Sequence, residues 1–144
     1  MSLAGEYFVA GELQRRRISA AVTYGNAKAA DVVAFSSDGE RAVVIEVKST
    51  AQSKWIVGGK VPAPTGQPWV FVHIPSDEVA SPEFFVVLQS ELHQILNQVD
   101  AAYRERYRAK HGSEFTGAGV VSLTREQALP YRNAWHSIKT AIGA

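Results

Sequence analysis

Apolar residues near the start of the chain recur at the spacing of one helix face. Val9, Ala10 and Leu13 lie on this face, and the charged residues Glu6 and Arg17 lie on the same face before and after them. The five residues have the spacing i, i+3, i+4, i+7 and i+11. This periodicity predicts a helix over residues 3–17. Gly11 lies inside it, and because glycine costs about 1 kcal/mol relative to alanine in a helix interior, we expect close packing at that residue.

Short apolar runs separated by turn residues predict strands in the next part of the chain. The expected strands span residues 18–24, 31–36, 41–50, 69–74 and 84–88, with a turn at Gly25-Asn26. Residues 51–68 contain three prolines and a pair of adjacent glycines. This composition predicts a long loop, of the kind that often carries function.

A helical pattern resumes after the last of these strands. Ser90 is expected to cap a helix that ends near His111. Val120-Val121 predicts a short edge strand, and Thr124 begins a final helical region that Pro130 interrupts. The elements together predict an α/β fold, in which helices flank a mixed β-sheet built around a central β-hairpin. The apolar stripe of the expected second helix consists of Leu92, Ile95, Leu96, Val99 and Tyr103.

The hairpin between the second and third expected strands has a definite register. Asp38-Gly39 between two apolar runs is a strong signal for a two-residue hairpin turn. With that turn, the numbers of paired residues sum to 77, so Asp31 lies opposite Glu46. Residues that are paired in this way point to the same face of the sheet. Lys48 lies two residues beyond Glu46 and shares its face.

Two carboxylates and an ammonium group are therefore expected close together in strands that are otherwise apolar. Opposed like charges destabilise a sheet, and charges in a largely buried sheet need partners or a metal. Mg²⁺ or Mn²⁺ relieves both problems, because carboxylate oxygens are hard ligands. A neighbouring lysine can orient water and stabilise charge on a phosphoryl oxygen. The pattern thus favours phosphodiester hydrolysis by a metal-activated water, without a covalent intermediate.

Composition narrows the classes of protein that need to be considered. A chain of 144 residues suits one domain over residues 1–144, and the absence of cysteine excludes disulfides and Cys-ligated metal sites. The net charge of +1 is low for a protein dedicated to coating DNA. The longest apolar run, residues 84–88, is too short to span a membrane, and no apolar leader is evident. We therefore expect a cytoplasmic protein.

The same residues resemble a known family. Asp31 is followed after fourteen residues by Ile45-Glu46-Val47-Lys48, which is similar to the signature of the PD-(D/E)xK phosphodiesterase superfamily. The segment from Gly5 to Leu13, which contains Glu6, resembles the first helix of the Holliday-junction-resolvase-like branch. The resemblance covers residues 5–50 best.

The resemblance implies a restriction-endonuclease-like fold and a DNA endonuclease. By similarity, Asp31, Glu46 and the carbonyl of Val47 would bind Mg²⁺ or Mn²⁺, Lys48 would be catalytic, and Glu6 would complete the metal and catalytic site. The partners implied are DNA, which is branched for resolvase-like members, and a second copy of the chain in a homodimer.

Three alternatives remain open from the sequence. Glu46 and Lys48 can form an ordinary solvated ion pair, which contributes little to stability. The chain can also be a catalytically silent nucleic-acid-binding or interaction module of the same fold. In the expected long loop, Lys54, Trp55 and Lys60 can follow a nucleic-acid strand by charge and stacking, or Trp55 can pack over the sheet.

Overall fold

A computed structural model of the chain describes residues 2–23, 31–59, 61–116 and 120–143. It confirms the predicted α/β class with a mixed sheet flanked by helices. The helical elements are α1 (Ser2–Arg15), α2 (Gln89–His111), α3 (Arg125–Ala128), the 3-10 turn η1 (Leu129–Tyr131) and α4 (His136–Ala141). The strands are β1 (Ser19–Val22), β2 (Val32–Phe35), β3 (Ala42–Thr50), β4 (Lys54–Gly58), β5 (Pro68–His73), β6 (Glu83–Leu88) and β7 (Val121–Thr124).

The predicted hairpin is present and forms the middle of the main sheet. Five strands lie in the order β1-β2-β3-β5-β6. Val32 pairs with Ile45 and Val33 with Val44, so the numbers of paired residues sum to 77 and the predicted register is confirmed over residues 32–35 and 42–45. The N–H of Asp31 instead donates to the carbonyl of Ile45, so the regular pairing ends before Asp31. Gly39 has a φ of 75°, a left-handed conformation that glycine adopts without steric cost at this turn. The turn at Gly25-Asn26 lies outside the described residues.

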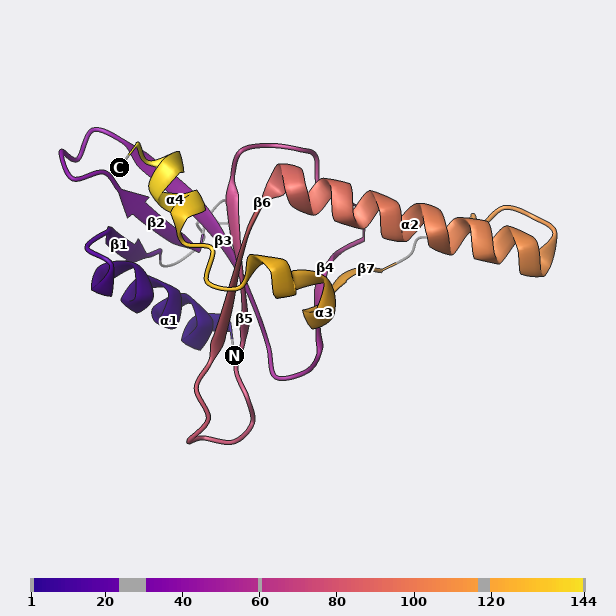
Figure 1. The fold of residues 1–144 in the computed structure, drawn as a ribbon, viewed down its shortest axis with the longest axis horizontal. Helices are drawn as coiled ribbons and strands as arrows, with labels where there is room; N and C mark the ends of the chain where they lie inside the picture. Colours follow the sequence, from indigo (N-terminus) through magenta and orange to yellow (C-terminus); the bar gives the residue numbers. More distant parts are fainter. Residues whose placement is uncertain (1, 24–30, 60, 117–119, 144) are drawn as a thin grey trace.

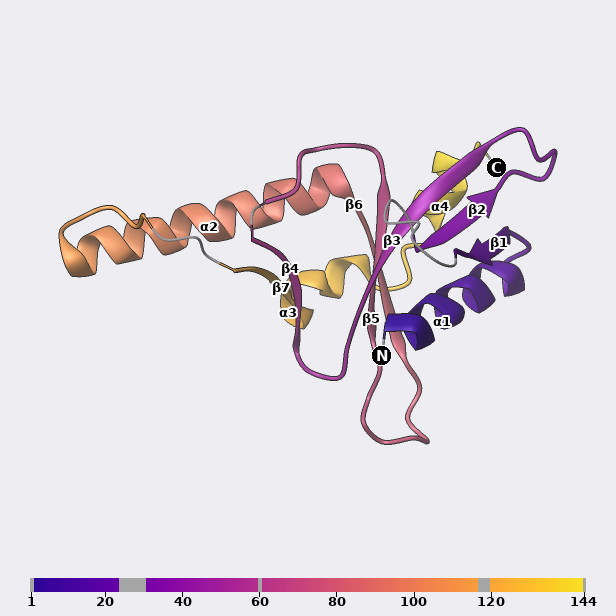
Figure 2. The same cartoon turned by 180° about the vertical axis from the view of Figure 1, so that it is seen from behind.

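Strand β5 makes the main sheet a mixed one. It runs parallel to β3 and antiparallel to β6. Five of its six residues are buried, which is the pattern of a strand covered on both faces. In Figures 1 and 2, α1 and α4 lie on one side of the sheet, whereas α2, α3 and the β4–β7 pair lie on the other.

Each side of the sheet has its own hydrophobic core. The core under α1 and α4 includes Val9, Leu13 and Trp135, and the buried Trp135 anchors the end of the chain to the sheet. The second core includes Trp55 and Phe71, whose rings meet edge to face at 5.4 Å between centroids. Two cores on opposite faces hold the sheet rigid between them.

The expectation of a structureless loop over residues 51–68 is wrong for its first half. Residues 54–58 form β4, which pairs antiparallel with β7 in a separate two-stranded sheet. Trp55 and Val57 alternate with exposed residues, but this short pattern lies beside adjacent glycines and prolines. Its partner strand lies more than sixty residues further along the chain, so local sequence carried little sign of the pairing.

Helix α2 begins as predicted but without the expected cap. Its N-cap residue is Leu88, and the N–H groups of Gln89 and Ser90 donate to the carbonyls of Gln67 and Thr65. Carbonyls of the preceding loop thus take the place of a side-chain cap.

Within the part of the chain that the structure describes, no helix is both long and apolar enough to cross a membrane.

The apolar stripe of α2 is buried only in its first half. Leu92 and Leu96 are buried, whereas Val99 and Tyr103 are exposed by 37% and 45%. Figures 1 and 2 show the outer half of this helix projecting from the rest of the molecule. Helical periodicity therefore predicted the face correctly but not how far the core extends along it.

Two glycines of α1 have opposite structural roles. Gly11 is exposed with no atom near its Cα substituent position, so the expectation of close packing there is wrong. Gly5 is the close approach instead, because a Cβ at that position would overlap Ser49 Oγ and lie 3.1 Å from Ser49 Cβ. Glycine at position 5 is what allows α1 to approach β3.

These roles predict stability changes of opposite sign. Gly11→Ala should raise the free energy of unfolding by about 1 kcal/mol, because alanine is the better helix former. Gly5→Ala should lower it by about 1–3 kcal/mol through overpacking, and adding Ser49→Ala should recover part of the loss. Urea unfolding of the four proteins measures this. Equal effects of the two alanine substitutions would contradict the close packing of Gly5 against Ser49.

Candidate active site

Strand β3 presents Glu46 and Lys48 on the face opposite α1. Ile45 and Val47, which alternate with them, are buried in the core beneath that helix. The side chains of Glu46 and Lys48 are 25% and 33% exposed, with 3.7 Å between Lys48 Nζ and Glu46 Oε1. Lys48 Nζ also lies 5.9 Å from the ring centroid of Trp69, a cation–π contact. The lysine is therefore held between a carboxylate and an indole.

Asp31 immediately precedes β2 and is held by hydrogen bonds from both its backbone and its side chain. Its N–H donates to the carbonyl of Ile45, and its own carbonyl accepts from the N–H of Thr23. Its carboxylate Oδ2 accepts from the N–H of Val47 at 2.8 Å. The N–H and C=O of a strand residue point to the same neighbouring strand, so the carbonyl of Val47 also faces the side where Asp31 lies.

Glu6 reaches the same region from α1. The close approach of Gly5 to Ser49 sets the start of α1 against β3, one residue before Glu6. Burial, the negative charge of Asp31 and a hydrogen bond that a protonated Glu6 donates to Asp31 all raise the pKa of Glu6. The negative charge of Glu46 adds a smaller contribution in the same direction.

Glu46 is the third carboxylate, and its pKa is also shifted. Burial and the charge of Asp31 raise the pKa of Glu46, and Lys48 offsets part of that rise. The charge of Asp31 thus raises the pKa of two glutamates that come from different elements, Glu6 of α1 and Glu46 of β3. Three carboxylates beside a single ammonium group repel one another, and a cation among them would relieve that repulsion.

The carboxylates do not form a closed cation site. Over residues 2–23, 31–59, 61–116 and 120–143, no three His, Asp or Glu side chains are grouped so as to hold a metal ion. Glu6 comes from the face that α1 covers and Glu46 projects from the other face, while Asp31 turns toward the backbone of Val47 between them. Mg²⁺ keeps several of its waters and needs only one or two carboxylates from a protein. Asp31, Glu46 and the Val47 carbonyl are the groups that could supply those ligands.

The face of the sheet that carries Glu46 is more open than expected. Val44 and Phe35 are 42% and 36% exposed, and Val33 is half-buried. The expectation of a largely buried sheet at this point is therefore wrong, because α2, α3 and the β4–β7 pair cover only the part of this face over β5 and β6. Glu46 and Lys48 lie at the border between the covered and the open parts, where a large substrate has access.

A second polar cluster escaped sequence reasoning. Glu83 of β6 accepts two hydrogen bonds from Arg125 and one from His73, and Arg132 lies 3.4 Å away. These three partners come from segments that lie far apart in the chain, so no local motif identified them. They lower the pKa of Glu83 to about 2, with the Arg125 hydrogen bond as the main cause. The cluster ties α3 and the following turn to the sheet and leaves no free acid or base.

The Glu83 cluster predicts a loss of stability in acid. The folded pKa of about 2 lies below the ordinary value of 4.5, so the stabilisation is complete above pH 4.5 and disappears as the pH falls toward 2. Glu83→Gln should lower the free energy of unfolding at neutral pH by about 1.5 kcal/mol. Urea unfolding between pH 3 and 7 should also show a shallower acid decline for this variant, and an unchanged decline would contradict the assignment.

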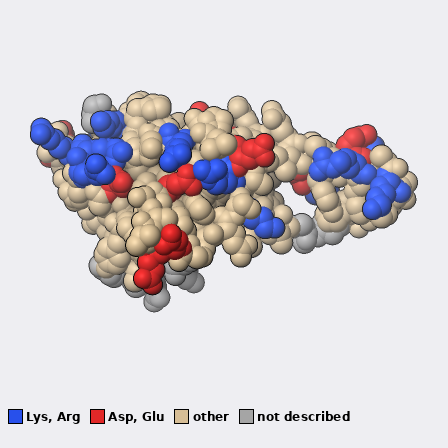
Figure 3. Space-filling model, turned by 60° about the horizontal axis from the view of Figure 1, so that its bottom comes forward, with Lys and Arg blue, Asp and Glu red and all other residues tan. Residues whose placement is uncertain are grey.

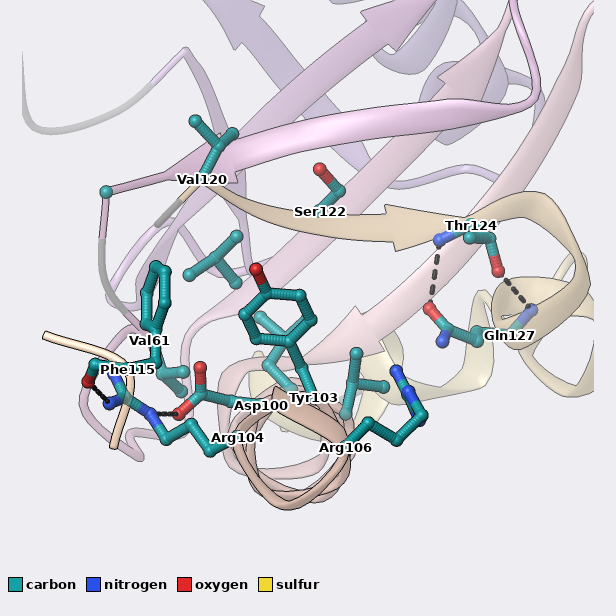
Figure 4. A pocket seen from close by; sticks show the side chains of 14 residues that line it. Val61, Asp100, Tyr103, Arg104, Arg106, Phe115, Val120, Ser122, Thr124 and Gln127 are labelled. Carbon is teal, nitrogen blue, oxygen red and sulfur yellow. Dashed lines mark hydrogen bonds and ion pairs between the residues drawn. The ribbon is translucent and has the colours of Figure 1, made fainter. Parts of the chain in front are cut away.

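A large hollow lies away from the carboxylates. It has a volume of about 580 Å³ and lies between α2 and β7, with Tyr103, Phe115 and Val120 among its lining residues (Figure 4). Its acid, Asp100, is held by Arg104 at 2.9 Å. An apolar lining without a free acid or base can bind ligands but gives no reason to place hydrolysis there.

The other basic and aromatic residues that could contact a nucleic acid lie in different environments. Trp55 is 1% exposed, so the alternative in which it packs over the sheet is confirmed, whereas Lys60 lies outside the described residues. On α2, Arg104 and Arg108 pair with acids of the same helix. Figure 3 shows Lys and Arg at both ends and across the middle of one face of the molecule, in groups that acidic and neutral surface separates.

The chain was also compared with known proteins. No protein-family model matches it, and no curated protein matches it. Function therefore has to be argued from the residues themselves.

Proposed function

We propose that the protein is a Mg²⁺-dependent endonuclease that hydrolyses DNA phosphodiester bonds at Asp31, Glu46 and Lys48. The observation that carries this proposal is the position of the Asp31 carboxylate, 2.8 Å from the N–H of Val47, on the strand where Glu46 and Lys48 lie 3.7 Å apart. The negative charge of Asp31 also repels Glu6 and Glu46 and raises the pKa of both. Such a repulsive group costs stability, and function is the usual reason for keeping it. The PD-(D/E)xK resemblance and its restriction-endonuclease-like fold supply the reaction class.

Each residue has a distinct role in this proposal. Asp31, Glu46 and the carbonyl of Val47 would hold the ion, and the N–H of Val47 keeps the Asp31 carboxylate in orientation. Bound there, Mg²⁺ would polarise the phosphodiester and favour ionisation of water. Lys48 stabilises the negative charge that grows on a phosphoryl oxygen in the transition state. Glu6, whose pKa is raised, is suited to accept a proton from the attacking water.

A direct assay tests the proposal. Supercoiled plasmid, single-stranded DNA and a four-way junction are each incubated with the protein and Mg²⁺, Mn²⁺ or EDTA. Cleavage with either divalent ion and none in EDTA is the expected result. Cleavage that persists in EDTA would remove the metal from the mechanism, and absence of cleavage of all three substrates would overturn the proposed activity. Gel filtration of the same sample tests the homodimer that the resemblance implies.

The second candidate is a silent nucleic-acid-binding module with the same site residues. The absence of a three-carboxylate cation site among the described residues favours it. This reading predicts DNA binding without cleavage, and no effect of Mg²⁺ on the melting temperature.

A further inference from the structure

A hollow lined by both polar and apolar side chains opens beside Lys48. It has a volume of about 290 Å³ and is lined by residues between 48 and 56, where β3 ends and the chain turns into β4. Thr50 and Gln52 contribute a hydroxyl and an amide to its wall. The hollow and the candidate active site therefore share Lys48.

The charge of this hollow is positive. Lys48 and Lys54 line it, and none of its lining residues is acidic. Glu46 lies 3.7 Å from Lys48, and within the described part of the chain no acidic side chain pairs with Lys54. Lys54 is exposed and unpaired among the described residues, and Lys48 is only weakly paired with Glu46. Two such ammonium groups side by side attract an anion.

The floor and rim of the hollow are suited to a nucleotide. Trp55 is fixed beneath it, because its ring is buried and its Nε1–H donates to the carbonyl of Val72 at 2.9 Å. Ile56 stands on the rim with 62% of its surface exposed. The two ammonium groups are suited to contact a phosphate, and the exposed Ile56 is suited to contact the sugar or base that follows it.

We propose that this hollow binds a backbone phosphate of the DNA strand next to the bond that is cleaved, with Lys54 as the phosphate-binding residue. The inference rests on the proposed function, because it takes the scissile phosphate to lie at Lys48. Lys54 positions the strand and does not touch the reacting atoms. Its loss should therefore weaken binding without removing the catalytic group.

Binding can be measured without cleavage. Fluorescence anisotropy of a labelled single-stranded DNA 12-mer in EDTA, from about 50 to about 200 mM NaCl, gives the salt dependence of affinity. One lost phosphate contact lowers the slope of log affinity against log salt by about 0.7 for single strands. We expect this change for Lys54→Ala and no change for Lys54→Arg. Lys139→Ala, on α4 at the opposite face of the sheet, is the matched control and should keep the wild-type slope.

The outcomes separate the two proposals. A wild-type slope in Lys54→Ala, an equal fall in Lys139→Ala, or no DNA binding by the wild-type protein would overturn the phosphate site. If the slope falls as expected but no substrate is cleaved with Mg²⁺, the phosphate site stands and the nuclease proposal fails. If DNA is cleaved but the slope is unchanged, the nuclease stands and this site fails.

Discussion

Removing the charge of Lys48 is expected to lower the rate of Mg²⁺-dependent DNA cleavage by about 10²–10³-fold. This is the usual loss when one group that stabilises transition-state charge is removed. Lys48→Met is the sharper variant, because it keeps an apolar stem beside Trp69 while removing the ammonium group. Lys48→Ala should give the same kinetic loss, and single-turnover cleavage of a labelled duplex measures it.

Folding and binding provide the controls for this result. Both Lys48 variants should melt close to the wild type, because the lysine is one-third exposed and its 3.7 Å ion pair and 5.9 Å cation–π contact each contribute little to stability. Lys139→Ala, on α4, should cleave at the wild-type rate. Undiminished cleavage by Lys48→Met would exclude Lys48 from the mechanism.

Asp31→Asn is expected to abolish the gain in stability from Mg²⁺ without destabilising the metal-free protein. The charge of Asp31 raises the pKa of both Glu6 and Glu46, so removing it relieves repulsion at nearly constant volume. The asparagine carbonyl oxygen can still accept from the N–H of Val47. The metal-free variant should therefore melt no lower than the metal-free wild type.

The effect of Mg²⁺ has a definite size. If the Kd is about 1 mM, about 10 mM Mg²⁺ adds RT ln 11, or about 1.4 kcal/mol, to the stability of the wild type. For a chain of this length the melting temperature rises by about 3–6 °C. Differential scanning calorimetry of both proteins in EDTA and in Mg²⁺, at fixed ionic strength, measures the shift. Equal shifts in the two proteins would place Mg²⁺ binding elsewhere.

The same comparison has a pH signature. Glu6 and Glu46 have folded pKa values above their ordinary value of 4.5, so the metal-free protein loses stability as the pH rises through that range. Asp31→Asn should flatten this decline, because it removes one cause of both shifts. Urea unfolding in EDTA between pH 4.5 and 8 measures it, and parallel curves would mean that Asp31 has no effect on the two glutamates.

The sequence by itself determined the elements that depend on neighbours along the chain. The hairpin register followed from Asp38-Gly39 and the apolar runs on either side, because a short turn leaves few pairings that keep one face buried. The first helix and its buried Val9 and Leu13 followed from periodicity. The pairing of β2 with β3 in turn gave the expected proximity of Asp31 to Glu46.

Only the tertiary structure decided the contacts between distant segments. It paired β4 with β7, set Gly5 rather than Gly11 against a strand, and turned the Asp31 carboxylate toward the N–H of Val47. It also left half of the α2 stripe exposed. These outcomes depend on which surfaces meet in space, and each surface is formed by residues too far apart in the chain for local propensity to specify.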